Sequence, residues 1–245
     1  MKKNNKKTSF LSLVLLAAFT LSITTLFNAH TLAAIDKSSC QITAENGEDG
    51  TYSKKQQQTI AKRITVRVRG DNNSGSGTIL ARKGNSYLVV TNYHVIRGTS
   101  NIKLTTVDGK THQAKIVPNL NFEKPDPALL FPDPNFEKSD LALLQFQTNQ
   151  KYCIQQITNT IPYPETEITA AGYSSAKGKI VSSTGTVEKI PFKPLKEGYQ
   201  IGYSSDIDQG MSGGAIINSR GEIIGINGIS KYPMLNTGYV YPDGS

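Results

Sequence analysis

The sequence predicts an all-β fold of the sandwich or barrel kind, arranged as two β-units. Three features support this prediction. Segments with strand-like patterns follow one another about every 8 to 12 residues, with turn residues between them. Ile64-Thr-Val-Arg-Val-Arg69 alternates apolar and polar residues strictly, as a strand with one buried face should. Asp108-Gly109, a strong hairpin signal, separates the strand-like residues 102–107 and 111–117.

The first 34 residues have the layout of a secretory signal peptide. A basic head of four lysines precedes the apolar residues 10–26, and Thr31-Leu-Ala-Ala34 supplies small residues for cleavage. We therefore expect export and cleavage after Ala33 or Ala34. The alternative is an uncleaved membrane anchor, because 17 apolar residues are near the lower limit for a membrane span.

Removal of residues 1–34 changes the charge only mildly. It takes away four lysines and no acids, so the formal net charge of +8 becomes +4 on a mature chain of 211 residues. Because no arginine-rich tract with interleaved aromatics is present either, we expect the basic residues to form a solvated face. Neither a nucleic acid nor, after cleavage, a membrane is an expected partner.

Cys40 and Cys153 are the two cysteines of the chain. An even number in an exported protein, without any C-x-x-C spacing, favours one disulfide over metal or redox chemistry. This disulfide would tie the N-terminal arm to the middle of the chain. The alternative is two free, buried thiols.

The first unit follows an N-terminal arm, residues 35–62, in which residues 53–62 have the composition of a short helix. We expect the first group of strands within residues 63–146, at 64–69, 87–91, 102–107 and 111–117. A linker with two prolines, residues 147–165, follows. The second unit, residues 166–245, should contain strands at 168–172, 180–190, 199–204, 215–218 and 222–229.

One internal repeat complicates the end of the first unit. Residues 121–130 and 135–144 match at eight of ten positions, with a spacing of 14. Two copies are too few for a solenoid, so we interpret them as a local duplication in a surface loop. The duplication places Asp126 and Asp140 at equivalent positions.

Ser212 is the candidate nucleophile. The glycines at positions 210, 213 and 214 leave the surrounding backbone bare, so that amide N–H groups can point into a common space. Taken alone, the segment could be an ordinary Gly-Ser turn. A serine hydroxyl becomes a good nucleophile when a neighbouring base, usually histidine, takes its proton.

The mature chain has two histidines, and His94 is the candidate base. It follows the apolar segment Val89-Val-Thr-Asn-Tyr93, at the point where a strand should give way to a loop. His112 instead shares strand parity with Ala114 and Ile116, which indicates a partly buried structural histidine.

Asp140 is the candidate for the carboxylate that orients the histidine, because it stands at the head of the apolar segment Leu141-Ala-Leu-Leu144. Asp126 is the alternative. Pro127 follows it directly, which disfavours a helical backbone at Asp126 and removes a backbone donor. We therefore prefer Asp140.

The order of these residues separates three classes of hydrolase. Gly210-Met-Ser-Gly-Gly214 also matches the G-x-S-x-G pattern of α/β-hydrolases, but those enzymes need a histidine after the serine. A subtilisin-type order would place the aspartate before His94. The order His, Asp, Ser is that of the chymotrypsin type. The chain contains no H-E-x-x-H, P-loop or dinucleotide motif, so we expect no metal and no organic cofactor.

The segments around these three residues resemble the catalytic motifs of trypsin-like serine peptidases, nearest to their bacterial secreted branch. The motifs are Thr91-Asn-Tyr-His94-Val, Ser139-Asp140-Leu-Ala-Leu-Leu and Gly210-Met-Ser212-Gly-Gly. Ser74-Gly-Ser-Gly-Thr78 resembles the strand that enters the histidine motif, and the match runs from about residue 60 to 240. The resemblance implies two six-stranded antiparallel β-barrels with the active site in the cleft between them.

The resemblance also implies an exported serine endopeptidase that acts on polypeptides through an acyl-enzyme. His94 would be the general base, Asp140 its orienting group and Ser212 the nucleophile. The N–H groups of Gly210 and Ser212 would form the oxyanion hole. The alternative function is that of a catalytically inactive, trypsin-like binding module.

Three positions bear on activation and substrate specificity. Met211 stands where vertebrate digestive members have an aspartate that pairs with a newly cleaved N-terminus, so we expect a site that forms without such processing. Asp206, six residues before Ser212, has the spacing of a pocket carboxylate that would select Arg or Lys, unless it faces solvent. Asn227 is near the place where glutamyl endopeptidases use a histidine to bind an acidic side chain, so we expect Asn227 to contact the substrate, and the missing histidine weakens an acidic specificity.

The chain ends about where trypsin-like serine peptidases continue into a closing strand or helix. We therefore expect either a second barrel that closes with fewer elements or a chain that is a fragment.

Overall fold

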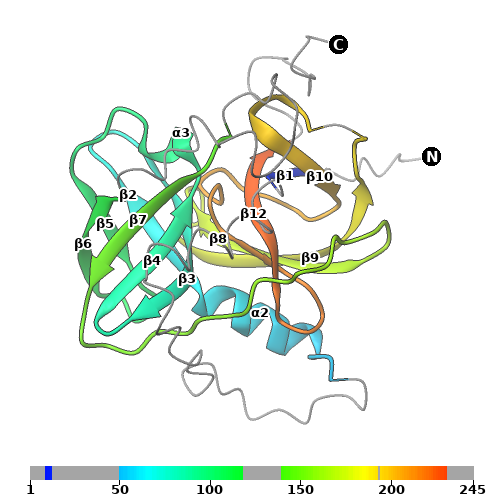
Figure 1. Ribbon diagram of the computed structural model, residues 1–245, viewed down its shortest axis with the longest axis horizontal. Coiled ribbons are helices and arrows are strands. Elements are labelled where there is room, and N and C mark those ends of the chain that lie inside the picture. The colour runs from blue at the N-terminus through cyan, green and yellow to red at the C-terminus, as the bar shows by residue number, and fades with distance from the viewer. Residues whose placement is uncertain (1–8, 13–49, 118–138, 193, 231–245) are drawn as a thin grey trace.

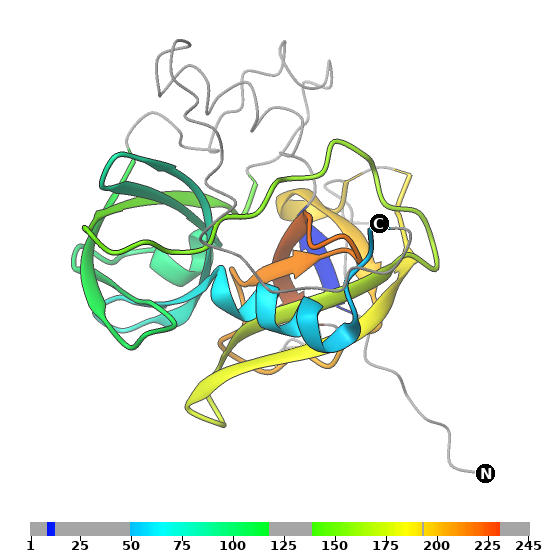
Figure 2. The ribbon, with the colours of Figure 1, turned by 90° about the horizontal axis from the view of Figure 1, so that it is seen from below.

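The computed structural model describes residues 9–12, 50–117, 139–192 and 194–230 (Figure 1). Within them the chain forms two closed antiparallel β-barrels that lie side by side, which confirms the predicted fold class (Figures 1 and 2). The longest helix of the described residues, α2 (Lys54–Arg63), packs against the second barrel.

The first barrel is an antiparallel sheet that closes on itself. Its strand order is β2-β3-β4-β7-β6-β5. Gly109 takes a φ of 80° in the predicted Asp108-Gly109 turn between β5 and β6. The strands are β2 (Thr65–Arg69), β3 (Ser74–Lys83), β4 (Ser86–Thr91), β5 (Ile102–Thr105), β6 (Thr111–Ile116) and β7 (Ala142–Gln147).

The second barrel has the order β1-β10-β9-β8-β11-β12. A 3₁₀ turn, Lys196–Gly198, leads into β10. The strands are β1 (Ser9–Ser12), β8 (Glu167–Ser174), β9 (Lys179–Lys189), β10 (Tyr199–Tyr203), β11 (Ala215–Ile217) and β12 (Ile223–Ser230).

The strand β1 differs from the sequence expectation, because its residues belong to the predicted signal peptide. It lies between β10 and β12 and pairs with both, for example Ser12 with Tyr199 and Leu11 with Asn227. A short apolar segment can satisfy the backbone groups of two neighbouring strand edges in this way. The signal peptide stays a prediction, and the C-terminal residues 231–245 lie outside the described residues.

Helix α2 (Lys54–Arg63) matches the predicted helix at 53–62. Ser53 and Gln56 form a capping box at its first turn, which satisfies amide groups that the helix itself leaves unpaired. Ile60 and Ala61 are buried, and Gln57 accepts a hydrogen bond of 2.9 Å from Thr169 of β8. The helix therefore covers one side of the second barrel.

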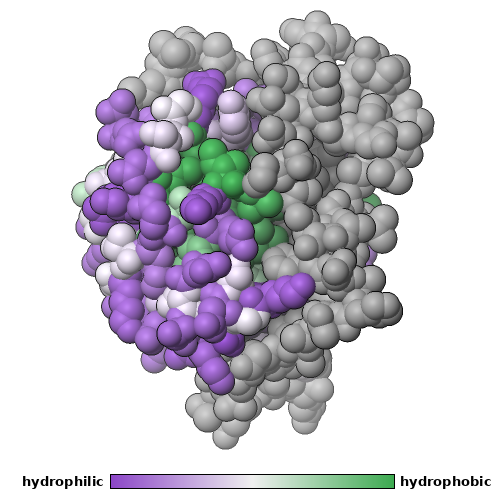
Figure 3. All heavy atoms as spheres, turned by 60° about the vertical axis from the view of Figure 1, so that its left-hand side comes forward, coloured by the Kyte–Doolittle hydropathy of each residue, from purple (hydrophilic) through white to green (hydrophobic). Residues whose placement is uncertain are grey.

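Apolar side chains join the two barrels. One buried cluster combines Leu88 and Leu143 of the first barrel with Ala171 and Ile217 of the second. On the face shown in Figure 3, hydrophilic residues border an apolar area on its left and lower sides. None of the described helices is long and apolar enough to cross a membrane.

Cys153 is buried, and the described residues contain no free cysteine. The predicted partner, Cys40, lies outside the described residues, so the disulfide stays a prediction.

Candidate active site

His94 lies at the edge of the first barrel, in the short helix α3 (Tyr93–Ile96) that follows β4. The sequence had predicted a loop here, and a single helical turn was missed because four residues carry too little periodicity. Asn92, fully buried, donates from its side-chain amide to the carbonyl oxygen of Asp140 at 2.9 Å. This bond ties the start of α3 to the segment that precedes β7.

Asp140 lies directly beside His94, because β4 and β7 pair from Thr91 and Ala142 onward. Its carboxylate is buried and accepts the backbone N–H of His94 at 2.8 Å and the ring Nδ1 of His94 at 2.6 Å. Since an ionised carboxylate only accepts hydrogen bonds, Nδ1 carries the proton and Nε2 is left as the basic nitrogen. The rival Asp126 lies outside the described residues.

Tyr199 is a further member of the site that the sequence analysis did not identify. It is the first residue of β10 in the second barrel, and its hydroxyl donates to the Asp140 carboxylate at 2.5 Å. The backbone N–H of Asp140 also donates to Glu197 at 3.0 Å. Both barrels therefore hold this carboxylate. A buried tyrosine at the start of a strand belongs to no motif, so only the tertiary structure reveals its role.

Ser212 lies in the tight loop between β10 and β11. Gly213 has a φ of 88°, and a Cβ atom there would come within 2.0 Å of the Ser76 carbonyl oxygen. Gly210 has a φ of 93°, and a Cβ atom there would come within 2.6 Å of the Tyr173 carbonyl oxygen. Glycine is required at both positions because other residues are strained at positive φ and would collide with the backbone.

The peptide group between Gln209 and Gly210 has a defined orientation. The carbonyl oxygen of Gln209 accepts the N–H of Ser175 at 2.8 Å. In a planar trans peptide the carbonyl and the N–H point in opposite directions, so the Gly210 N–H points away from Ser175. It has no acceptor among the described residues.

The peptide group between Met211 and Ser212 is held in a similar way. The carbonyl oxygen of Met211 accepts the side-chain amide of Asn227 at 2.9 Å and the N–H of Gly214 at 3.0 Å. The Ser212 N–H on the opposite side of this peptide also has no acceptor within the described part of the chain. Two free N–H donors, two residues apart, are the parts that an oxyanion hole needs.

The Ser212 hydroxyl donates to the carbonyl oxygen of Gly228 at 3.0 Å, and no hydrogen bond joins it to His94 in the described structure. The structure therefore joins His94 to Asp140 and leaves the serine in a separate contact. A rotation about the Cα–Cβ bond of Ser212 would release its hydroxyl from Gly228. Hydrogen bonds of catalytic groups are often absent or long before a substrate binds.

The remaining predicted site residues lie in different environments. Met211 is buried, and its sulfur accepts the N–H of Asp208 at 3.3 Å. Asn227 is fully buried, so its side chain is not exposed to a substrate in this structure. Asp206 lines a pocket of about 340 Å³ together with residues of α2, β8 and β9, and His94, Asp140 and Ser212 do not line it.

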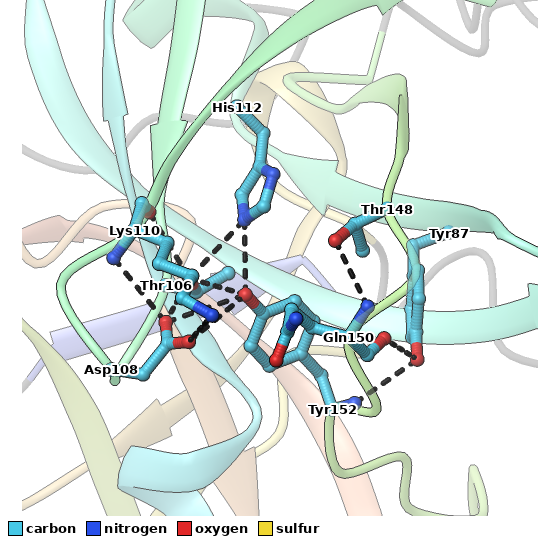
Figure 4. A network of polar contacts seen from close by, with 8 residues as sticks. All are labelled: Tyr87, Thr106, Asp108, Lys110, His112, Thr148, Gln150 and Tyr152. Atoms are coloured by element: carbon cyan, nitrogen blue, oxygen red, sulfur yellow. Dashed lines mark hydrogen bonds and ion pairs between the residues drawn. The ribbon is translucent and has the colours of Figure 1, made fainter.

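His112, the other histidine of the predicted mature chain, belongs to a polar network inside the first barrel (Figure 4). Its Nε2 lies 3.0 Å from the hydroxyl of Tyr152, which in turn lies 3.3 Å from both carboxylate oxygens of Asp108. Burial lowers the pKa of His112; the Asp108 charge opposes this effect, and the Lys110 charge adds to it. These contacts support the expected structural role.

The pKa values of two other residues in this network, Tyr152 and Asp108, are shifted in opposite directions. Burial raises the pKa of Tyr152. For Asp108, burial acts to raise the pKa, but hydrogen bonds from Thr106, the Lys110 amide and Tyr152 outweigh it, so the pKa is lowered. The described residues contain no group of three or more potential metal ligands.

Comparisons with known proteins show the family to which the chain belongs. The model of the trypsin-like peptidase domain family matches residues 75–226. A probable periplasmic serine protease of the Do/HhoA kind from Haemophilus influenzae is 34% identical over 157 residues, which are 62% of this chain and 30% of that protein. The serine endoprotease DegS of Salmonella typhimurium is 26% identical over 179 residues, 73% of this chain and 44% of that protein.

Among solved structures, a serine endoprotease from Yersinia pestis has a similar fold. Its TM-score is 0.57 at 24% sequence identity, and the match covers 78% of this chain and 63% of that one. The chain spans about a third of the length of the first curated relatives it matches, 30% and 32% of the Haemophilus protein and of the chloroplastic protease Do-like 1 of Arabidopsis thaliana.

Proposed function

The chain belongs to the trypsin-like peptidase domain family, and from this membership we propose that it is a serine endopeptidase. The observation that carries the proposal is the contact of 2.6 Å between the buried carboxylate of Asp140 and the partly exposed ring of His94, which leaves Nε2 of His94 as a base. The similar curated proteins are named as serine proteases, which supports the same reaction class.

The proposed reaction begins when the Ser212 hydroxyl attacks the carbonyl carbon of a peptide bond and gives its proton to Nε2 of His94. The carbonyl oxygen becomes an oxyanion, which the N–H groups of Gly210 and Ser212 stabilise. The C–N bond then breaks, and His94 returns the proton to the departing amine. This leaves an ester between Ser212 and the acyl half of the substrate.

Water completes the cycle. Nε2 of His94 takes a proton from a water molecule, which attacks the ester carbon and forms a second oxyanion at the same two N–H groups. When this intermediate collapses, the proton returns to the oxygen of Ser212 and a carboxylic acid leaves. Asp140 orients the imidazole and stabilises its charged form in both halves of the reaction.

Labelling with a fluorescent fluorophosphonate tests this proposal, because the reagent reacts with serines activated by a base. We expect the wild-type protein to be labelled and the Ser212→Ala variant to remain unlabelled. Ser100→Ala, which changes a serine in the first barrel that contacts Asp71, is the matched control and should label like the wild type. A folded wild-type protein that is never labelled would favour the inactive binding module.

We further propose that the protein is exported. The predicted signal peptide and the word periplasmic in the name of the Haemophilus relative support this location. N-terminal sequencing of protein recovered from outside the cytoplasm should give a chain that begins at Ala34 or Ile35. Material that begins at Met1 would instead indicate a retained anchor.

The spacing and the location of Asp206 point to different roles in substrate recognition. Asp206 has the spacing of a basic-specific pocket residue, but it lines a pocket beside α2. We therefore propose to profile cleavage sites in a peptide library with the wild type and with Asp206→Asn. A preference for Arg or Lys that disappears in the variant would support the assignment of Asp206.

A further inference from the structure

Asn227 occupies an unusual place for a residue expected to contact substrate. Its side chain is fully buried in β12, and both ends of its amide are hydrogen-bonded. The Nδ2 atom donates to the carbonyl oxygen of Met211 at 2.9 Å, and Oδ1 accepts the hydroxyl of Tyr203. No part of this side chain is left to bind a ligand from solvent.

The contacts determine which way the amide is turned. A peptide carbonyl can only accept, so the atom that faces Met211 must be the NH₂ group. The oxygen then faces Tyr203, whose hydroxyl is a suitable donor. Tyr203 is itself buried, in β10, so the orientation of Asn227 is determined by neighbours on two strands.

The Met211 carbonyl belongs to the same peptide group as the N–H of Ser212. Because this peptide is planar, a bond that holds the carbonyl also fixes the direction of the N–H. We propose that Asn227 is a positioning residue that aims the Ser212 N–H at the oxyanion, acting through the carbonyl of Met211. This inference rests on the proposed function, since it assigns a role within the same site.

Asn227→Asp gives the sharpest test. The protonated carboxyl group has the shape of the amide and can donate to Met211, whereas the ionised carboxylate cannot donate and repels the carbonyl oxygen. The fall in the maximal rate should be about tenfold to a hundredfold, somewhat less than for the complete loss of an oxyanion donor. The ratio of variant to wild-type rate should therefore rise as the pH falls.

Saturation kinetics of fluorophosphonate labelling between pH 5 and 9 supply this ratio. Asn227→Ala, which lacks the donor at every pH, should give a low ratio that does not change with pH. Asn218→Asp is the matched control, because Asn218 is also buried and donates to Glu222 in the turn between β11 and β12. Its ratio should stay near one, and the reagent concentration at half-maximal rate should change little in all variants.

Other results would overturn the inference. A pH-independent ratio for Asn227→Asp, or an equal loss in Asn218→Asp, would show a general structural effect. A weaker half-saturation at an unchanged maximal rate would instead show that Asn227 contacts the reagent. If Asn227→Asp does not fold, Tyr203→Phe replaces it as the test, because it removes the hydroxyl that orients the Asn227 amide. A several-fold lower maximal labelling rate would support the inference, and an unchanged rate would contradict it.

The wild-type protein separates this inference from the proposed function. If the wild type is not labelled, the proposed function fails and the role of Asn227 fails with it. If the wild type is labelled, the ratios test Asn227 alone.

Discussion

The hydroxyl of Ser76, in the first barrel, donates to the carbonyl oxygen of Gly210 in the second barrel at 2.8 Å. The same oxygen of Ser76 accepts the N–H of Tyr173 at 2.7 Å, and the backbone N–H of Ser76 donates to the Ser212 carbonyl at 2.8 Å. Thr78, two residues further along β3, donates to Gly213 at 3.0 Å. Strand β3 therefore anchors the loop that carries Ser212 across the boundary between the two barrels.

Ser76→Ala and Thr78→Val should both destabilise the protein. Each removes a donor to a backbone carbonyl oxygen, partly buried at Gly210 and buried at Gly213, and a buried acceptor left unpaired costs about 1 to 3 kcal/mol. Urea denaturation measures the free energy of unfolding. Thr59→Ala, at an exposed position of α2, is the control and should change it by less than about 0.5 kcal/mol. Equal effects at all three positions would contradict the anchoring role of β3.

Asp140→Asn should lower the turnover of a peptide substrate by about 10⁴, because the amide would favour the wrong tautomer of His94. Asp126→Asn, the corresponding change in the other copy of the repeat, should leave turnover unchanged. Steady-state kinetics of both variants decide between the two aspartates. The opposite pattern would assign the triad carboxylate to Asp126.

Tyr199→Phe should reduce turnover without unfolding the protein. The hydroxyl of Tyr199 donates to the carboxylate of Asp140, and a hydrogen bond to a charged group contributes about 1.5 to 3 kcal/mol. If most of this energy orients the His94–Asp140 pair, turnover should fall about 10- to 100-fold. Tyr163→Phe, at an exposed tyrosine of the linker, is the control. Unchanged turnover in Tyr199→Phe would show that the backbone contacts orient Asp140 sufficiently.

Gly213→Ala should abolish fluorophosphonate labelling. The added methyl group would lie 2.0 Å from the Ser76 carbonyl oxygen at a φ of 88°, so the loop must move. Gly109→Ala is a matched control, because Gly109 has a similar φ of 80° but open space around its Cβ position. It should cost about 1 to 2 kcal/mol of stability and leave labelling intact. Similar labelling of the two variants would contradict the close approach of β3 to the loop.

His112 should make the first barrel less stable at low pH. Its pKa is lowered in the folded protein, so the unfolded chain binds more protons as the pH falls through about 6.5. Stability contributed by the neutral imidazole is therefore present at pH 8 and lost toward pH 5. His112→Gln should remove this part of the pH dependence, which melting temperatures of both proteins at the two pH values would show. Parallel curves would mean that His112 does not contribute.

The sequence predicted most of the described fold because the strands have clear local patterns. Strict alternation marked β2, and the Asp108-Gly109 turn marked the hairpin of β5 and β6. The order of His94, Asp140 and Ser212 predicted the reaction class, and the pairing of β4 with β7 explains how the first two come together.

The supporting contacts of the site were not predictable in the same way. Ser76 lies 134 residues from Gly210, and Tyr199 lies 59 residues from Asp140. Such contacts depend on how two barrels pack, which no local pattern encodes. Asn227 was expected to contact the substrate, but its side chain is buried and donates to the Met211 carbonyl. The sequence does not distinguish these roles, because a side-chain amide can bind a substrate or a backbone carbonyl of the protein itself.

The placement of β1 would link the proposed signal cleavage to the candidate active site. Strand β1 pairs with Tyr199, which contacts Asp140, and with Asn227, which contacts Met211. A peptidase that cleaved the precursor after Ala33 or Ala34 would remove this strand, which pairs with both Tyr199 and Asn227. Secretion would then remodel the catalytic machinery as well as release the enzyme, and precursor and mature form should differ in reactivity.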